Sequence, residues 1–484
     1  MNRQIVQLFG LSMILFATLI AFTSRWTVFE ADALKDPNDR RGQANKRELI
    51  AQQQIPRGLI KTADGTVVAR SLPRGRGEER VFTRTYPEAG LFAHAVGYSF
   101  IQRGSAGIEQ SRNDALVGEE NEFGTIFSEL QSEEREGSDV ISTLDTSAQK
   151  TAAQALGGQT GSVVAIEPQT GRVKVMVSLP EYDPNQIPDR FGPLASDEAQ
   201  PLFNRATQSS YPPGSTFKVV TAAAALDSGK FTPDSVVDGS SPRTISGAPL
   251  ANSGGANFGP ITLTEALTNS VNTVWAQVGE QIGPKTLLEY MNRFGFNRDP
   301  ELDYPDGQML ASGVRNAKGD LVDDTGGFDI GRVAIGQGGE EGTTLVSPLQ
   351  MALVACAVGN GGELMRPRLT ERIVGKDGRV DERLQPVEQS QVMKRETAEQ
   401  LAGMMSNVVN EGTGTAAALE GIDVAGKTGT AEVDNATSNQ AWFIGFAPVQ
   451  NPRMAVAVTI ERTQGQGGTE AAPIAKQVLQ ELLQ

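Results

Sequence analysis

The longest run of apolar positions in the chain lies close to its amino-terminal end. Residues 5–22 are apolar except for one Gln, one Gly, one Ser and one Thr. About 18 such residues are at the lower length limit for a membrane-spanning helix. A cleaved signal peptide is the alternative, but Ala21–Arg25 offers no convincing small-x-small cleavage site. The pattern therefore favours a retained anchor over residues 5–24, behind a short tail of residues 1–4.

The pattern becomes mixed between the anchor and about residue 155. The charged stretch 32–48 indicates a linker or a helix. Segments 55–60 and 66–69 predict two short strands around an Asp-Gly turn. Residues 119–139 are strongly acidic, which is typical of a solvated surface or an extended arm. We interpret residues 25–155 as a mixed, β-rich, non-catalytic module.

The remaining residues, 156–484, show the pattern of a second domain. Segments 162–166 and 173–177 are apolar and flank a Pro-Gln-Thr-Gly turn, which predicts a β-hairpin. Buried strands are also predicted over residues 442–446 and 454–460. Strands at both ends with helices between them predict an α+β sandwich whose first and last strands share one sheet. Helical periodicity is found in residues 215–226, 261–277, 284–294, 345–355, 394–411 and 472–483.

The segment Tyr211–Leu226 is rich in small and apolar residues. Pro213 and Gly214 break the preceding loop, and apolar residues then recur at helical spacing. Ser215 starts this helix and Lys218 follows one turn later, which brings an amine next to a hydroxyl. Poor solvation favours the neutral form of such a lysine, and a neutral lysine can activate a serine. A capping serine beside a snorkelling lysine explains the same residues.

Composition narrows the possible functions. The 484 residues are 39% hydrophobic and 21% charged, which is enough for two or more globular units. The formal net charge of −15 argues against nucleic-acid binding through a basic face. The single cysteine, Cys356, lies in an apolar run and is predicted to be a packed side chain. The single histidine, His94, excludes a multi-histidine metal site and leaves lysine as the more consistent base for a nucleophile.

Three short motifs follow one another inside the predicted second domain. They are Ser215-x-x-Lys218, Ser270-x-Asn272 and Lys427-Thr428-Gly429, an order that is met in a class of serine acyltransferases. Each motif is weak alone, since Ser147-x-x-Lys150 and Ser111-x-Asn113 also occur. Those two copies precede the core of the domain and are predicted to be structural. The three motifs together are a strong signal.

A competing pattern overlaps the last of these motifs. Residues Gly421–Thr428 match G-x-x-x-x-G-K-T, which would make Lys427 a nucleotide ligand. In a P-loop, however, the threonine opens a helix whose amino end faces the phosphates. Here Thr428 leads towards the predicted strand 442–446 without a helical apolar period. A P-loop nucleotide hydrolase therefore stays the alternative from a different class.

The motifs, written as Ser215-Thr-Phe-Lys218, Ser270-Val-Asn272 and Lys427-Thr-Gly-Thr430, resemble the active site of the penicillin-binding protein transpeptidases. Segments Arg57-Gly58 and Gly104–Glu109 are similar to the pedestal module of class B members. The size is most similar to the short actinobacterial penicillin-binding protein A type. Further similar stretches are Asn204–Ala206, Gly336–Gly338, Ser347–Gln350, Gly361-Gly362 and Trp442–Gly445.

This resemblance implies both fold and function. The implied fold is a serine β-lactamase-like domain, in which helices enclose an antiparallel sheet beside an all-helical subdomain, held outside the cytoplasm by a single-pass anchor. The implied function is D,D-transpeptidation of peptidoglycan stem peptides in cell-wall synthesis and division, inhibited by β-lactams. A membrane glycan-polymerising synthase is the implied partner, and no cofactor, metal or nucleic acid is implied. A D,D-carboxypeptidase or a β-lactam-sensing or -hydrolysing relative would carry the same site.

The resemblance also implies the catalytic roles. Ser215 attacks the carbonyl between two D-alanines, and Lys218 takes its proton. Ser270 relays that proton to the leaving amine, while Asn272 holds Lys218 and the substrate amide.

Substrate binding is assigned by the same resemblance to the third motif. Its residues form an edge strand that pairs with the peptide, and Gly429 allows a close backbone approach. Lys427, Thr428 and Thr430 bind the terminal carboxylate. The backbone amides of Ser215 and Thr430 form the oxyanion hole.

Overall fold

The structure is a computed structural model that describes residues 3–25, 54–75, 80–118, 136–322, 327–339, 341–433 and 437–484. The chain divides into two compact units, residues 1–56 with 73–83 and residues 57–72 with 84–484. The predicted charged stretch 32–48 and most of the acidic stretch 119–139 lie outside the described residues.

Helix α1 (Arg3–Ser24) is the main element of the first unit. Its segment Gln7–Ser24 has a mean hydropathy of 1.7 and is long and apolar enough to cross a membrane. This helix is consistent with the predicted membrane anchor.

A five-stranded antiparallel sheet organises the second unit. Its strand order is β20-β21-β22-β7-β8, so the last strand of the chain, β22, pairs with the first strand of the domain, β7. This confirms the predicted sandwich whose first and last strands share one sheet. The strands are β7 (Gly161–Ile166), β8 (Val173–Leu179), β20 (Ala425–Val433), β21 (Ser438–Ala447) and β22 (Met454–Thr463).

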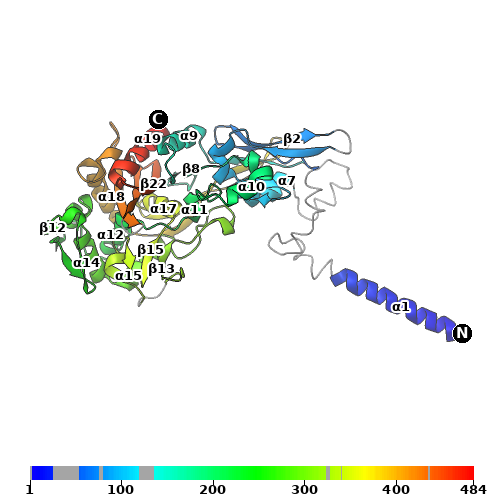
Figure 1. Ribbon diagram of the computed structural model, residues 1–484, viewed down its shortest axis with the longest axis horizontal. Coiled ribbons are helices and arrows are strands. Elements are labelled where there is room, and N and C mark those ends of the chain that lie inside the picture. Colours follow the sequence, from blue (N-terminus) through cyan, green and yellow to red (C-terminus); the bar gives the residue numbers. More distant parts are fainter. Residues whose placement is uncertain are drawn as a thin grey trace. The chain divides into compact units, whose positions relative to one another are not determined.

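Both faces of this sheet are covered by helices (Figure 1). In β7, Val163 and Ala165 join the apolar cluster that includes α9 (Thr146–Leu156) and α19 (Ala472–Leu483). The alternate residues Val164 and Ile166 join the cluster that includes α17 (Pro348–Gly359). The alternation of side chains along a strand thus places one helical layer on each face.

A helical region lies on the α17 side and carries the second motif. The predicted single helix over residues 261–277 is wrong, because the chain forms α13 (Leu263–Thr268) and then α14 (Asn272–Ile282). Ser270 between them has a φ of 58°, in the left-handed region that an α-helix cannot contain. The predicted capping box of Thr262 and Glu265 is present at the start of α13. The other helices here are α12 (Lys218–Asp227), α15 (Pro284–Arg293), α16 (Ile330–Val333) and α18 (Arg395–Asn410).

A second, six-stranded sheet has the order β18-β17-β6-β1-β2-β3. Strands β1 and β2 pair antiparallel around the predicted Asp-Gly turn, but β1 shares only Ile60 with the predicted strand 55–60. Strands β17 and β18 come from residues beyond α17 and complete this sheet. The bounds are β1 (Ile60–Lys61), β2 (Val67–Arg74), β3 (Val81–Thr85), β6 (Asp139–Ser142), β17 (Thr370–Val374) and β18 (Val380–Arg383).

Candidate active site

Ser215 lies in a 3-10 turn, η5 (Gly214–Phe217), which leads directly into α12. The turn is held by hydrogen bonds to its backbone: Gly214 N donates to Gly336 O at 3.1 Å, and Trp442 Nε1 donates to Pro212 O at 2.9 Å. Among the described residues, no side chain caps η5 or α12, so Ser215 is not a capping serine. The alternative that explained the first motif by capping alone is therefore wrong.

Lys218 is fully buried at the start of α12. Its Nζ lies 2.7 Å from Ser270 O, 2.7 Å from Asn272 Oδ1 and 3.3 Å from Ser270 Oγ. Burial, with a further contribution from the charge of Lys427, lowers the pKa of Lys218 well below its ordinary value. This direction is the one that the prediction of a neutral, basic lysine requires.

The contacts of Lys218 define where its lone pair can act. A neutral amine has two N–H donors, and Ser270 O and Asn272 Oδ1 can only accept. A neutral Lys218 that donates to those two oxygens keeps its lone pair for a hydroxyl. Ser270 Oγ lies 3.3 Å from Lys218 Nζ and accepts from Lys427 Nζ at 2.9 Å.

The left-handed backbone of Ser270 serves this arrangement. It lets one residue present both its carbonyl oxygen and its hydroxyl to Lys218. A non-glycine residue in this conformation costs about 1–2 kcal/mol, and such strain is concentrated at functional sites. Two residues on, Asn272 is oriented by its Nδ2, which donates to Ala251 O at 3.1 Å.

The third motif lies on β20, at the edge of the five-stranded sheet, as predicted. Lys427 is fully buried, and burial lowers its pKa to about 7. The hydroxyls of Thr428 and Thr430 are hydrogen-bonded within the chain. Thr428 Oγ1 lies 2.6 Å from Thr413 Oγ1, and Thr430 Oγ1 accepts from Gly467 N at 3.1 Å.

Gly429 allows a close backbone approach, as expected, and the structure shows which element approaches it. A Cβ atom at this position would lie 2.6 Å from Pro213 O and 2.9 Å from Thr216 Cγ2. The element that approaches the α-carbon of Gly429 is therefore the turn that carries Ser215, not a peptide along the open edge. Gly429 brings the first and third motifs together.

Ser215 itself differs from the sequence expectation in one contact. Within the described residues, its Oγ makes no hydrogen bond, and Lys218 instead contacts Ser270 and Asn272. The three-residue spacing brings Lys218 onto the helix behind the serine, but the polar groups of the second motif take its donors. All three motifs nevertheless converge through the contacts of Ser270 Oγ and Gly429.

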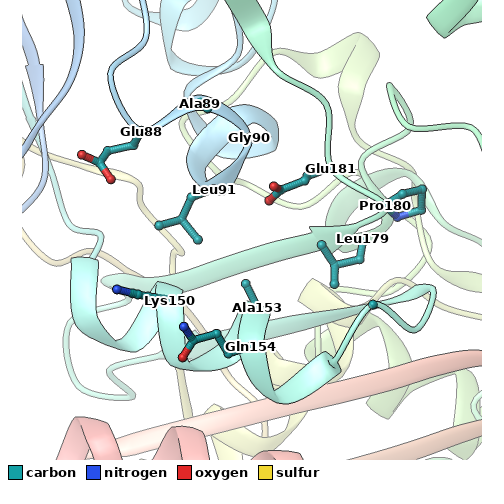
Figure 2. Close-up of a pocket in the computed structure, with 11 residues that line it drawn as sticks. Glu88, Ala89, Gly90, Leu91, Lys150, Ala153, Gln154, Leu179, Pro180 and Glu181 are labelled. Carbon is teal, nitrogen blue, oxygen red and sulfur yellow. The ribbon is translucent and has the colours of Figure 1, made fainter.

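The repeated copies of the motifs lie elsewhere. Ser147 and Lys150 are on α9, where Ser147 Oγ donates to Glu481. Lys150 lines a cavity of about 530 Å³ between α9 and the turn η3 (Ala89–Phe92), away from the motif residues (Figure 2). Ser111 Oγ donates to Asp303 O, and Asn113 accepts from Arg57. These copies are structural, as predicted.

The P-loop pattern, the single histidine and the single cysteine are accounted for by secondary structure and burial. The P-loop interpretation is wrong, because Lys427 and Thr428 lie inside a strand rather than at the start of a helix. His94 is buried, with its Nε2 at 2.9 Å from Pro201 O, and burial lowers its pKa to about 4. Cys356 is buried in α17.

Three residues of the site had no assigned role in the sequence analysis. Gly336 and Trp442 hold the serine turn. Gly336 lies in a stretch noted only for family resemblance, and Trp442 in one that was also predicted as a buried strand. Thr413 contacts Thr428 from the loop after α18. A flanking pair of glycines, Gly412 and Gly414, is the one local signal that marks it.

Comparison with known proteins gives consistent matches. Residues 161–480 match the penicillin binding protein transpeptidase domain, and residues 57–140 match the penicillin binding protein A dimerisation domain. The chain is 34% identical to the peptidoglycan D,D-transpeptidase PbpA of Mycolicibacterium smegmatis, covering 98% of each. Penicillin-binding protein A from M. tuberculosis, in a ceftriaxone acyl-enzyme complex, is 30% identical with a TM-score of 0.80, covering 90% of this chain and 100% of that one. A D,D-transpeptidase domain from Eggerthella lenta is 34% identical with a TM-score of 0.78, covering 89% and 98%.

Proposed function

Because this chain belongs to the class B penicillin-binding protein transpeptidases, we propose that Ser215 is the residue acylated during its reaction. The protein is a serine peptidoglycan D,D-transpeptidase that binds penicillin. The observation that carries the assignment of residues is the position of Ser270 Oγ, within hydrogen-bond distance of both Lys218 Nζ and Lys427 Nζ.

Acylation begins with proton transfer from Ser215. When substrate enters, Lys218 accepts the proton of the Ser215 hydroxyl, and Oγ forms a bond to the carbonyl carbon between the two D-alanines. The carbon–nitrogen bond to the terminal D-alanine then breaks. Ser270 passes a proton from Lys218 to the departing amine, which its contact with Lys218 supports.

The rest of the site stabilises charge and orients groups. The backbone amides of Ser215 and Thr430 form the oxyanion hole, an arrangement typically worth about 3–4 kcal/mol per donor. Lys427 places positive charge beside Ser270, and with Thr428 and Thr430 it binds the terminal carboxylate of the substrate. Asn272 orients Lys218. An amine from a neighbouring stem peptide then attacks the acyl-enzyme and completes the cross-link.

Mass spectrometry of the intact wild-type protein after incubation with benzylpenicillin tests this assignment. We expect one added penicilloyl group per chain, carried after proteolysis by the peptide that contains Ser215. The adduct is expected to persist long enough to isolate, because the proposed reaction resolves the acyl-enzyme with an amine rather than with water. An adduct on any other serine, or rapid release of penicilloic acid, would contradict the assignment.

We also propose how the chain is organised at the membrane. Residues 5–24 anchor it as a single span, residues 1–4 lie in the cytoplasm, residues 25–155 form the pedestal and residues 156–484 form the catalytic domain outside the cytoplasm. The apolar helix α1 supports this arrangement. The pedestal is the module proposed to meet a membrane glycan-polymerising synthase.

Photocrosslinking from the exposed surface of the pedestal in cells tests this partnership. A crosslinker at Arg70 of β2 is expected to capture a glycan polymerase, whereas one at Glu399 on α18 of the catalytic domain is not. Equal capture from both positions, or capture from neither, would refute the proposed partner surface.

A further inference from the structure

Thr413 lies next to the third motif. It follows α18 in the loop Glu411–Gly414, and its side chain is exposed. Its Oγ1 lies 2.6 Å from Oγ1 of Thr428, which is buried. No other hydrogen bond of the Thr413 hydroxyl is found within the described residues. The two hydroxyls therefore form one short hydrogen bond, and the hydroxyl that does not donate in this bond keeps its proton for another acceptor.

The direction of this hydrogen bond decides what Thr428 can offer to an anion. A hydroxyl has one proton to donate. If Thr428 donates to Thr413, only lone pairs of Thr428 face the substrate, and they repel a carboxylate. If Thr413 donates to Thr428, the proton of Thr428 is free to bind the carboxylate.

The neighbouring hydroxyl has the same arrangement with a fixed direction. Thr430 Oγ1 accepts from the backbone N–H of Gly467 at 3.1 Å, so the Thr430 proton is free. Gly467 packs closely at this place, since a Cβ atom would lie 2.1 Å from Trp442 O. Thr430 thus has a donor from the protein behind it, and Thr413 is the group placed to serve Thr428 in the same way.

The loop of Thr413 also contacts the segment of the second motif. Thr413 N donates to Thr268 O at 3.4 Å, and a Cβ atom on Gly412 would lie 2.4 Å from the same oxygen. Thr268 ends α13, two residues before Ser270. The loop is therefore fixed against the end of α13, while the hydroxyl of Thr413 reaches Thr428 on β20.

From this geometry, and on the basis of the proposed function, we infer that Thr413 is a positioning residue for substrate recognition. Its hydroxyl donates to Thr428 and so makes Thr428 a donor to the carboxylate of a stem peptide or β-lactam. Without the Thr413 hydroxyl, the oxygen of Thr428 loses its donor, so Thr428 is a weaker donor to the carboxylate and binding is weakened.

Acylation kinetics of three variants test the inference. Thr413→Val keeps the shape but removes the hydroxyl, and we expect its second-order rate constant with benzylpenicillin to fall about tenfold, which equals about 1.4 kcal/mol. Thr413→Ser is expected to stay within about twofold of the wild type. Thr415→Val, an exposed threonine two residues further on, is the matched control and is expected to have the wild-type rate.

A neutral substrate separates recognition of the carboxylate from a general structural effect. With benzylpenicillin methyl ester, which has no carboxylate, Thr413→Val is expected to acylate at the wild-type rate. In a Thr428→Val background, Thr413→Val is expected to have no further effect, because it acts through Thr428. Equal losses with both compounds, or additive losses in the double variant, would overturn the inference.

Failure of this inference is distinguishable from failure of the proposed function. If the wild-type adduct does not map to Ser215, the proposed function fails. If the adduct maps to Ser215 but Thr413→Val reacts with benzylpenicillin at the wild-type rate, only the role of Thr413 fails.

Discussion

Replacing Lys218 with methionine is expected to slow acylation by benzylpenicillin by about 1,000-fold, within the range of general-base contributions. Methionine has a similar length and suits the buried position, so the change removes the base with little change in packing. Stopped-flow measurement of the acylation step, apart from initial binding, gives the relevant rate. Circular dichroism and thermal unfolding establish that the variant is folded.

The chain contains a matched control for this substitution. Lys150 has the same spacing from Ser147 that Lys218 has from Ser215, but it is exposed on α9. Lys150→Met is therefore expected to acylate at the wild-type rate. A Lys218→Met variant that reacts as fast as Lys150→Met would show that another group takes the Ser215 proton.

The pH dependence of acylation follows from the same pKa. Lys218 must be neutral to act as a base, so the rate should fall as pH decreases through its pKa in the folded protein. Above about pH 7 the rate should also fall, because Lys427, whose pKa is about 7, loses the charge that is proposed to bind the carboxylate. Burial and the nearby charge of Lys427 lower the pKa of Lys218 well below the ordinary lysine value, so the acidic limb lies at lower pH than for a solvated lysine. This limb of the pH profile should be absent in Lys218→Met.

Elements that depend on local pattern were predicted well from the sequence. α19 spans residues 472–483 as expected, α18 differs from its prediction by one residue at each end, and the first hairpin pairs as proposed. Their apolar periodicity directly reflects the faces that they bury. Such segments need no information from distant parts of the chain.

The break at Ser270 was not predictable in this way. A capping box starts the segment and apolar residues continue beyond it, so local pattern favours one helix. The left-handed residue is accompanied by the contact of its carbonyl oxygen with Lys218, which lies 52 positions earlier in the chain. A conformation supported by such a distant side chain leaves no periodic signal in the sequence.

The order of the three motifs predicted the site, but not how its parts fit together. Spacing alone suggested that Lys218 contacts Ser215, whereas its donors go to Ser270 and Asn272. In the same way, the role of Gly429 depends on which element lies over it. A glycine in a strand indicates close approach but does not identify the neighbour.

Replacing Gly429 with alanine should therefore disturb the turn that carries the proposed nucleophile, Ser215, rather than the open edge of β20. The added Cβ would lie 2.6 Å from Pro213 O and 2.9 Å from Thr216 Cγ2, so the turn that carries Ser215 must move. A displacement of about 1 Å at a reacting group can cost about 100-fold in rate. We expect at least about that loss in the acylation rate with benzylpenicillin, because the Ser215 hydroxyl and its backbone amide both belong to the displaced turn.

Two further variants separate this effect from a general response to alanine. A Cβ atom on Gly403, on the exposed side of α18, would meet no atom of the described residues within 4 Å, beyond its own helix backbone and chain neighbours. Gly403→Ala should therefore keep the wild-type rate and gain up to about 1 kcal/mol of stability.

Thr216→Ser removes the Cγ2 contact while keeping the hydroxyl that donates to Pro213 O at 2.8 Å. Combined with Gly429→Ala, it should restore part of the rate, since the contact with Pro213 O remains. If Gly429→Ala alone acylates as fast as Gly403→Ala, the turn and the strand are not coupled through this glycine.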